Sequence, residues 1–175
     1  MVKPRRAQPT VKFIDDYCEA DRDLFPEVRT FEYFKYLHLG MISDIKRKTL
    51  PVIAKVVGWE DAEGLDHFLT ESPWSVEELK ERRLEIVLNL LNGEEITVII
   101  DETGDKKKGR TTDYVKRQYI GNLGKIENGI VAVTAWGLFR GMTFPLIAKV
   151  YKLREKLKEG YEYKSKPKIG GEIIQ

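Results

Sequence analysis

The sequence contains few of the residues that build disulfide or metal–thiolate frameworks. Its 175 residues include one cysteine, Cys18, and two histidines, His38 and His67. A single cysteine excludes an internal disulfide and a cysteine-built zinc site, and neither histidine lies in an HExxH-like pattern. Long apolar runs are missing too, since the longest, around 98–100, is far too short to cross a bilayer. These absences exclude zinc-cage, haem-thiolate and membrane-spanning classes.

Nor does the N-terminus read as a signal peptide, because its basic residues are followed by no apolar stretch. Hydrophobic residues make up 42% of the chain and charged residues 33%, which is enough to bury a core. We therefore expect a folded, soluble, cytoplasmic protein with no membrane partner.

The first half has the periodicity of helices. Apolar residues recur at three- and four-residue spacing and predict helices beginning near Thr30 and covering 50–57, 62–69 and 76–91. Ser75 and Glu78 form a capping-box pattern at the start of the last helix, which should end at the Asn92–Gly93 pair. Residues 1–92 are thus expected to form an all-helical N-terminal domain that serves DNA binding or dimerisation.

After Gly93 the period changes to that of strands. Residues 96–100 form a β-branched run typical of a strand buried on both faces. Residues 129–139 and 142–151 predict an antiparallel hairpin turning at 140–141, with a bulge or edge position near Pro145. A helix should start at 166–167. The overall class is α+β, with a second domain over 93–175.

The formal net charge is +2, but the two halves differ. Residues 1–92 carry 14 basic and 17 acidic residues, whereas residues 93–175 carry 16 basic and 11 acidic ones. Seven basic residues and one acid, Asp113, fall within 106–126. Such a concentration attracts polyanions such as nucleic acid, although charge alone favours a solvated, lysine-rich loop.

The helical pair at 49–70, joined at Gly58, is compatible with a DNA-binding helix-turn-helix. An ordinary helical hairpin is the commoner arrangement. The second helix carries five acids, which phosphates repel. DNA contacts in this half would therefore fall on Lys46, Arg47, Lys48 and Lys55.

A carboxylate, Asp101, directly follows the strand expected over 96–100. A residue at the last position of a buried strand lies at the rim of a sheet, where ligands bind in many α/β proteins. Mg²⁺ prefers oxygen ligands, and two such ions can activate a water and stabilise the leaving oxygen of a phosphodiester. Asp-Glu-Thr-Gly is also good turn chemistry, so this tetrapeptide alone fits a plain charged turn equally well.

The block containing Asp101 reads IDETGDKKKG and is followed by RQYIGNLGK; HFLTESPWS precedes the long helix. Over roughly residues 12–175 the chain resembles the DDE transposases of bacterial insertion sequences. This resemblance implies a helical domain over 1–92, followed by the first three antiparallel strands of an incomplete ribonuclease H-like catalytic domain over 93–175. The implied activity is Mg²⁺-dependent (or Mn²⁺-dependent) phosphoryl transfer, which cuts transposon ends and joins them to target DNA.

The same resemblance implies the site residues. Asp101 falls on the first acid of the Asp–Asp–Glu triad and would be both catalytic and a metal ligand, whereas Glu102 and Asp105 are neighbours in the motif and not triad members. Trp136, on the second expected strand, should be a core residue and not a base-stacking platform. By charge and position, the expected DNA contacts are Lys106, Lys107, Lys108, Arg110, Arg117 and Gln118.

The chain departs from the family pattern at its end. In the family, a strand with the second Asp and a later helix with the Glu follow the helix that begins here near 166. The resemblance therefore implies a polypeptide truncated inside the catalytic domain, not catalytic alone, whose partners are DNA, further copies of itself or a full-length transposase. It would be nucleoid-associated when bound to DNA. The alternatives are a non-catalytic DNA-binding regulator of transposition and a functionless relic.

Overall fold

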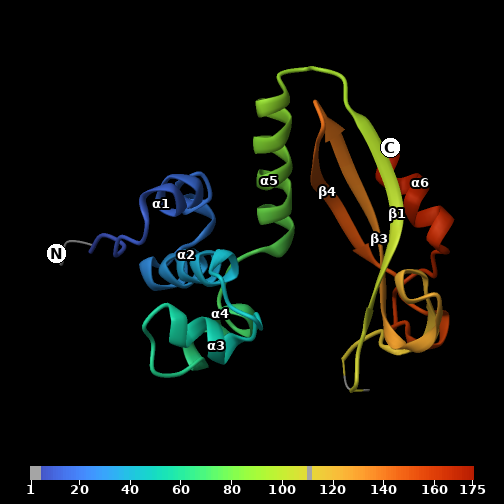
Figure 1. The fold of residues 1–175 in the computed structure, drawn as a ribbon, viewed down its shortest axis with the longest axis horizontal. Coiled ribbons are helices and arrows are strands. Elements are labelled where there is room, and N and C mark those ends of the chain that lie inside the picture. The colour runs from blue at the N-terminus through green and yellow to red at the C-terminus, as the bar shows by residue number, and fades with distance from the viewer. Residues whose placement is uncertain (1–4, 110–111) are drawn as a thin grey trace. The chain divides into compact units, whose positions relative to one another are not determined.

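A computed structural model describes residues 5–109 and 112–175 (Figure 1). The contacts divide the chain into two compact units, with the boundary along the chain between Ile86 and Val87. This division falls inside helix α5 (Val76–Leu91). No helix among the described residues is long and apolar enough to cross a membrane.

The first unit is helical. It contains α1 (Lys12–Glu19), the 3-10 helix η1 (Arg22–Leu24), α2 (Val28–Ile42), α3 (Leu50–Val56), α4 (Glu63–Thr70) and the beginning of α5. The four helices expected from periodicity are confirmed. Helix α1 was missed because its buried side is only two residues, Ile14 and Cys18, one turn apart.

An aromatic cluster forms the core of this unit. Phe25 is fully buried, with its ring centroid 4.6 Å from that of Phe34, and Trp74 stacks on Phe68 at 5.1 Å. The Trp74 indole N–H donates to the Phe68 carbonyl at 2.7 Å, so the polar end of the ring is satisfied. Aromatic pairs of this kind stabilise by about 0.5–1.5 kcal/mol beyond their buried area.

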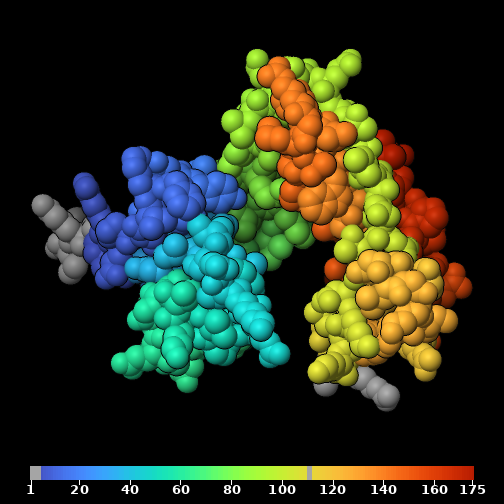
Figure 2. Space-filling view, in the orientation of Figure 1, coloured from blue at the N-terminus to red at the C-terminus, as the bar shows by residue number. Residues whose placement is uncertain are grey.

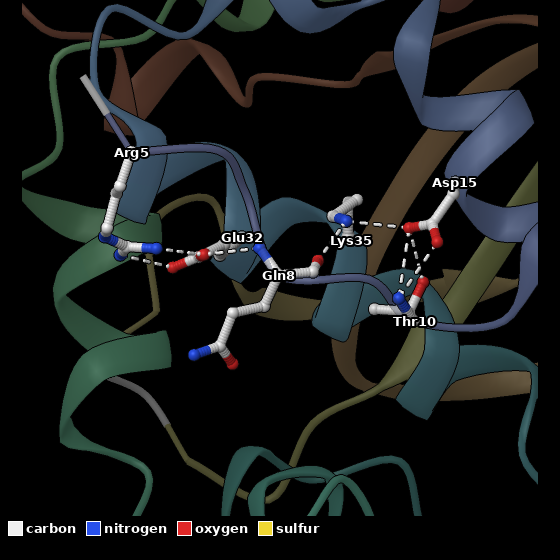
Figure 3. A network of polar contacts seen from close by, with 6 residues as sticks. All are labelled: Arg5, Gln8, Thr10, Asp15, Glu32 and Lys35. Carbon is white, nitrogen blue, oxygen red and sulfur yellow. Dashed lines mark hydrogen bonds and ion pairs between the residues drawn. The ribbon is translucent and has the colours of Figure 1, made fainter. Parts of the chain in front are cut away.

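A polar network ties the N-terminal arm to α2 (Figure 3). Arg5 makes a bidentate ion pair with Glu32, which also accepts from the Gln8 N–H. The Lys35 ammonium donates to the Gln8 carbonyl and, at 2.7 Å, to Asp15. Glu32 is 8% exposed and Lys35 4%, so both charges depend on these partners.

The second unit is built on an antiparallel sheet of β1 (Thr97–Lys106), β2 (Lys116–Ile120), β3 (Lys125–Phe139) and β4 (Met142–Val150), in which β3 pairs with each of the others. Three of these strands confirm the sequence prediction, whereas β2 was not predicted. The β3–β4 hairpin turns at Arg140–Gly141, both with positive φ. The predicted bulge is confirmed, because the register shifts opposite Pro145.

Helix α6 (Lys166–Ile174) covers one face of this sheet. Ser165 caps its first turn by accepting from the Lys168 N–H, as the predicted helix start required. Ile169 is buried with Val131 and Val133 of β3, and Gly170 lies against the side chain of Ile100. The short connections η2 (Gly121–Leu123) and η3 (Arg154–Lys156) complete the unit. The predicted α+β class is confirmed, and the open antiparallel sheet is compatible with an incomplete ribonuclease H-like fold.

The opposite face of the sheet is open, and two sequence predictions about it are wrong. Ile99, which pairs with Trp136, is 42% exposed, so the run 96–100 is not buried on both faces. Trp136 is 38% exposed and therefore not a core residue. The physical reason is that, within the second unit's described residues, α6 packs on one face only. Figure 2 shows atoms of β1 (yellow-green) and of the β3–β4 hairpin (orange) in front, with α6 (red) behind.

Candidate functional site

Asp101 lies in the middle of β1 and not at its end, which corrects the sequence prediction. Asp101 pairs with Thr134, and the ladder continues for five more residues to Lys106, which pairs with Gly129. The turn-forming chemistry of Asp-Glu-Thr-Gly is overridden because β3 is long enough to hold these residues in an extended conformation. The carboxylate therefore projects from the surface of the sheet and not from its rim.

The Asp101 carboxylate is exposed and lightly held. One oxygen, Oδ1, accepts from the backbone N–H of Glu102 at 2.8 Å. On the same face, Thr134 donates from its hydroxyl to the Asp101 carbonyl at 3.1 Å and accepts from the Trp136 indole N–H at 3.2 Å. Within residues 5–109 and 112–175 no ion pair involves Asp101. Its charge is thus free to attract a cation.

The next acid, Glu102, points to the other face, because successive residues of a strand alternate. It makes an ion pair with Lys166 of α6 at 2.7 Å. The pleat therefore separates two carboxylates that are adjacent in sequence, so they do not act as a pair. Lys166 was not singled out from the sequence. Its position at the start of the predicted last helix was the one feature that could have pointed to it.

Asp101 has the chemistry of one ligand for a hard divalent cation, since an exposed carboxylate is what Mg²⁺ prefers. The described part of the chain holds no group of three His, Cys, Asp or Glu residues that could bind a metal ion. The residues on the open face beside Asp101 are Ile99, Thr103 and Thr134. The described residues therefore fit a single metal ligand and not a complete site.

The expected DNA contacts divide between the two faces. Arg117 pairs with Asn128 and lies on the open face with Asp101, whereas Gln118 pairs with Glu127 and Lys106 pairs with Gly129, on the face that α6 covers. Arg117 thus shares the open face with Asp101, but its partner Asn128 lies six residues along β3 from Thr134, so the two side chains are not neighbours; Lys106 and Gln118 lie on the other face.

Several of the expected contacts are already engaged. Lys106 makes an ion pair with Glu127 at 3.1 Å and Lys107 one with Asp105 at 2.5 Å. The Gln118 amide donates to the Gly129 carbonyl at 3.0 Å. Arg110 lies outside the described residues.

Lys108 and Arg117 are exposed and line one pocket at the β2–β3 edge. Neither has an ion-pair partner in the part of the chain that the structure describes. They are therefore the most available cations of the set. The Asn128 amide, which the sequence did not single out, donates to the carbonyls of Lys107 and Gly109 and holds the start of this basic loop.

In the first unit, α3 and α4 pack through Ile53, Ala54 and Leu65. The Lys48 ammonium donates to the Ser43 carbonyl just before α3. Glu60, Glu63 and Asp66 add negative charge along α4 and its approach. This unit therefore offers phosphates a less favourable surface than the second.

Comparisons with known proteins bear on this geometry. Residues 23–147, which include β1 with Asp101 and most of the sheet, match the family described as DDE superfamily endonuclease. The chain belongs to this family. The resemblance stated from the sequence is therefore confirmed at the level of the family.

This DDE-family chain is also 63% identical over all its 175 residues to a "Probable transposase for insertion sequence element IS701" of Microchaete diplosiphon. It spans 46% of that relative's length. No solved structure matches the chain.

Proposed function

We propose that this chain is the N-terminal part of a DDE transposase, which binds DNA of an insertion sequence and supplies Asp101 as a metal-binding carboxylate. One observation supports this most: a family member presents an exposed acid, with no ion-pair partner among the described residues, on the open face of a sheet that also carries Arg117. A carboxylate for a cation and a cation for a phosphate on one face suit a phosphodiester substrate.

The chemistry would come from Mg²⁺ or Mn²⁺, which when bound activates a water and stabilises the leaving oxygen of a phosphodiester. Asp101 would contribute one negatively charged oxygen ligand on the open face. The Glu102 N–H bond to Oδ1 fixes the rotation of that carboxylate. Arg117 and Lys108 would position the DNA backbone, whether it belongs to a transposon end or to target DNA.

We further propose that the 175-residue polypeptide does not cleave DNA by itself. The triad of the family needs a second Asp and a Glu, and the described residues place no two further acids with Asp101. Cleavage would require those residues from outside the 175 residues, either from further length of the same protein or from a full-length copy. Such a protein would act in the cytoplasm and, when DNA-bound, at the nucleoid.

The experiment mixes this chain with a second polypeptide that corresponds to the remaining length of the IS701 relative, plus Mg²⁺ and duplex DNA carrying the ends of the insertion sequence. We expect cleavage from the mixture and none from the chain alone. Asp101→Asn should abolish cleavage, whereas the matched control Asp105→Asn, an exposed acid on the same strand, should retain it. Retained cleavage with Asp101→Asn would show that the acid is misassigned.

A second candidate function is that of a non-catalytic DNA-binding regulator of transposition. The absence of a three-acid cluster from the described residues favours it. It predicts salt-sensitive binding to insertion-sequence ends by the chain alone, with no cleavage in the reconstituted mixture. A functionless relic would instead bind no DNA and aggregate.

A further inference from the structure

A cluster of tyrosines and cations lies on the second unit, where the chain leaves β4 and enters α6. Tyr151, Tyr161 and Tyr163 come from this connection, and Tyr114 comes from the residues before β2. The hydroxyls of Tyr151 and Tyr163 lie 3.0 Å apart, with the rings edge to face at 6.4 Å. The cluster therefore gathers residues from distant parts of the sequence.

Each ring of this cluster holds a cation. The Lys152 ammonium lies 3.8 Å from the Tyr161 ring centroid and 5.4 Å from that of Tyr114. The Arg154 guanidinium lies 4.7 Å from the Tyr163 ring, and the Lys166 ammonium 5.3 Å from the Tyr151 ring. Cations over aromatic rings are attracted by the ring quadrupole, which orders them without cancelling their charge.

Three carboxylates of these segments are paired with other lysines. Glu155 makes an ion pair with Lys116, Glu162 with Lys168, and Asp113 with Lys158. Within the described ranges, Lys152 and Arg154 have rings as their partners and no carboxylate at ion-pair distance. Two ordered, uncompensated positive charges therefore stand beside exposed aromatic surface, since Tyr161 is 54% exposed.

Tyr114 adds an independent sign that the cluster is constrained. Its φ is +61°, in the left-handed region that a bulky side chain rarely adopts. Such a conformation costs about 1–3 kcal/mol and concentrates at ligand-binding sites. Here it places the Tyr114 ring against Lys152.

We propose that this cluster binds a single strand of DNA, with a base stacked on Tyr161 and the adjacent phosphates held by Lys152 and Arg154. The proposal rests on the proposed function, because it assumes that the chain acts on DNA. Aromatic side chains bordered by cations are the combination that unpaired strands require. In a duplex the bases are already stacked, so the cluster should distinguish unpaired DNA from duplex.

The position in the fold adds a consequence. Lys166 of the cluster pairs with Glu102, on the face opposite Asp101. A strand bound at the cluster is therefore not the strand presented to Asp101. The cluster would hold the complementary, unpaired DNA strand apart from the strand that faces Asp101.

The experiment measures binding of fluorescently labelled oligothymidylate to the full chain by anisotropy, and repeats it with an abasic oligonucleotide of equal length, which keeps the phosphates and lacks the bases. Tyr161→Ala should weaken binding of the thymidylate by about 5- to 150-fold, the effect of about 1–3 kcal/mol for one stacked base. The same variant should leave binding of the abasic strand unchanged. Tyr161→Phe should bind like the wild type.

The matched control is Tyr119→Ala, which removes a tyrosine of the same unit that is 55% exposed but outside the cluster. We expect its thymidylate affinity to stay close to that of the wild type. Lys152→Met should weaken both oligonucleotides, because it removes a phosphate contact. Circular dichroism and thermal unfolding establish that each variant is folded.

The proposal is overturned if Tyr161→Ala affects the two oligonucleotides equally, or if it lowers stability while DNA binding is unchanged. Duplex DNA separates this failure from that of the proposed function. If the chain keeps salt-sensitive duplex binding but Tyr161→Ala has no base-dependent effect, only the proposal for the cluster is refuted. If the chain binds neither single-stranded nor duplex DNA, the proposed function is refuted as well.

Discussion

Lys35→Met should destabilise the first unit far more than a lysine substitution on its surface. Methionine keeps most of the length of the lysine side chain and removes its charge. The change leaves the Asp15 carboxylate and the Gln8 carbonyl without the ammonium that now serves both, at 2.7 Å and 2.5 Å (Figure 3). Removing one partner of a fully buried ion pair costs about 3–5 kcal/mol.

The expected loss here is smaller, at about 2–3 kcal/mol, because Asp15 is not fully buried. Its side chain is 29% exposed and keeps two donors from Thr10, the backbone N–H and the hydroxyl. The matched control is Lys12→Met. Lys12 pairs with Asp16 at 2.5 Å, but its side chain is 87% exposed, and exposed pairs one turn apart contribute about 0.5 kcal/mol or less.

Urea unfolding followed by tryptophan fluorescence measures this difference, since two of the three tryptophans, Trp59 and Trp74, lie in the first unit. We expect a lower midpoint for Lys35→Met with an unchanged slope. If the two variants lose the same free energy of unfolding, the reasoning is refuted and the network of Figure 3 contributes no more than a surface pair.

Other predictions concern the first unit. The hydrogen bonds from Arg5 hold the pKa of Glu32 below its ordinary value, so this carboxylate stabilises the fold above its ordinary pKa. The difference in unfolding free energy between wild type and Glu32→Gln should therefore close as the pH falls through the folded-state pKa. Urea unfolding at several pH values measures this difference. Burial raises the pKa of Asp21, whose Oδ1 is buried and has no hydrogen-bond partner among the residues that the structure describes. Asp21→Asn should therefore stabilise the protein at neutral pH by about 1 kcal/mol and lose this advantage in acid, where Asp21 is protonated. Burial also raises the pKa of the Cys18 thiol to about 12, so a thiol reagent should label Cys18 only as fast as the unit opens. Gly40→Ala should cost about 1–3 kcal/mol in a thermal melt, since its methyl group would overlap the buried Ile53 side chain.

The helical half could be predicted from the sequence because its signals are local. The Ser75 cap at α5, the proline-containing start of α3 and the left-handed pair Asn92–Gly93 all lie within one turn of the boundary that they set. Strand β2 could not be predicted, because KRQYI has little apolar character and its extended form depends on pairing with β3, which lies later in the chain. The length of β1 was missed for the same reason.

The candidate site likewise combines features that have a local signal in the sequence with features that strand pairing determines. Asp101 could be singled out from the block around it, but its position in the middle of a strand follows from the pairing with β3. The separation of Arg117 from Gln118 depends on the strand register, which the sequence does not display. The exposure of Ile99 and Trp136 depends on which face α6 covers, and that contact is not local either.

The pleat of β1 determines how a site around Asp101 can be completed. Its own strand offers Ile99 and Thr103 on the same face, and β3 offers Thr134, so none of these neighbours supplies a second carboxylate. Glu102 points away and is neutralised by Lys166. Further acids can therefore reach Asp101 only from a segment that covers the open face or lies beside the edge of β1 opposite β3. The same segment would bury Ile99 and Trp136, so we expect assembly of the proposed catalytic site and burial of this apolar surface to occur together.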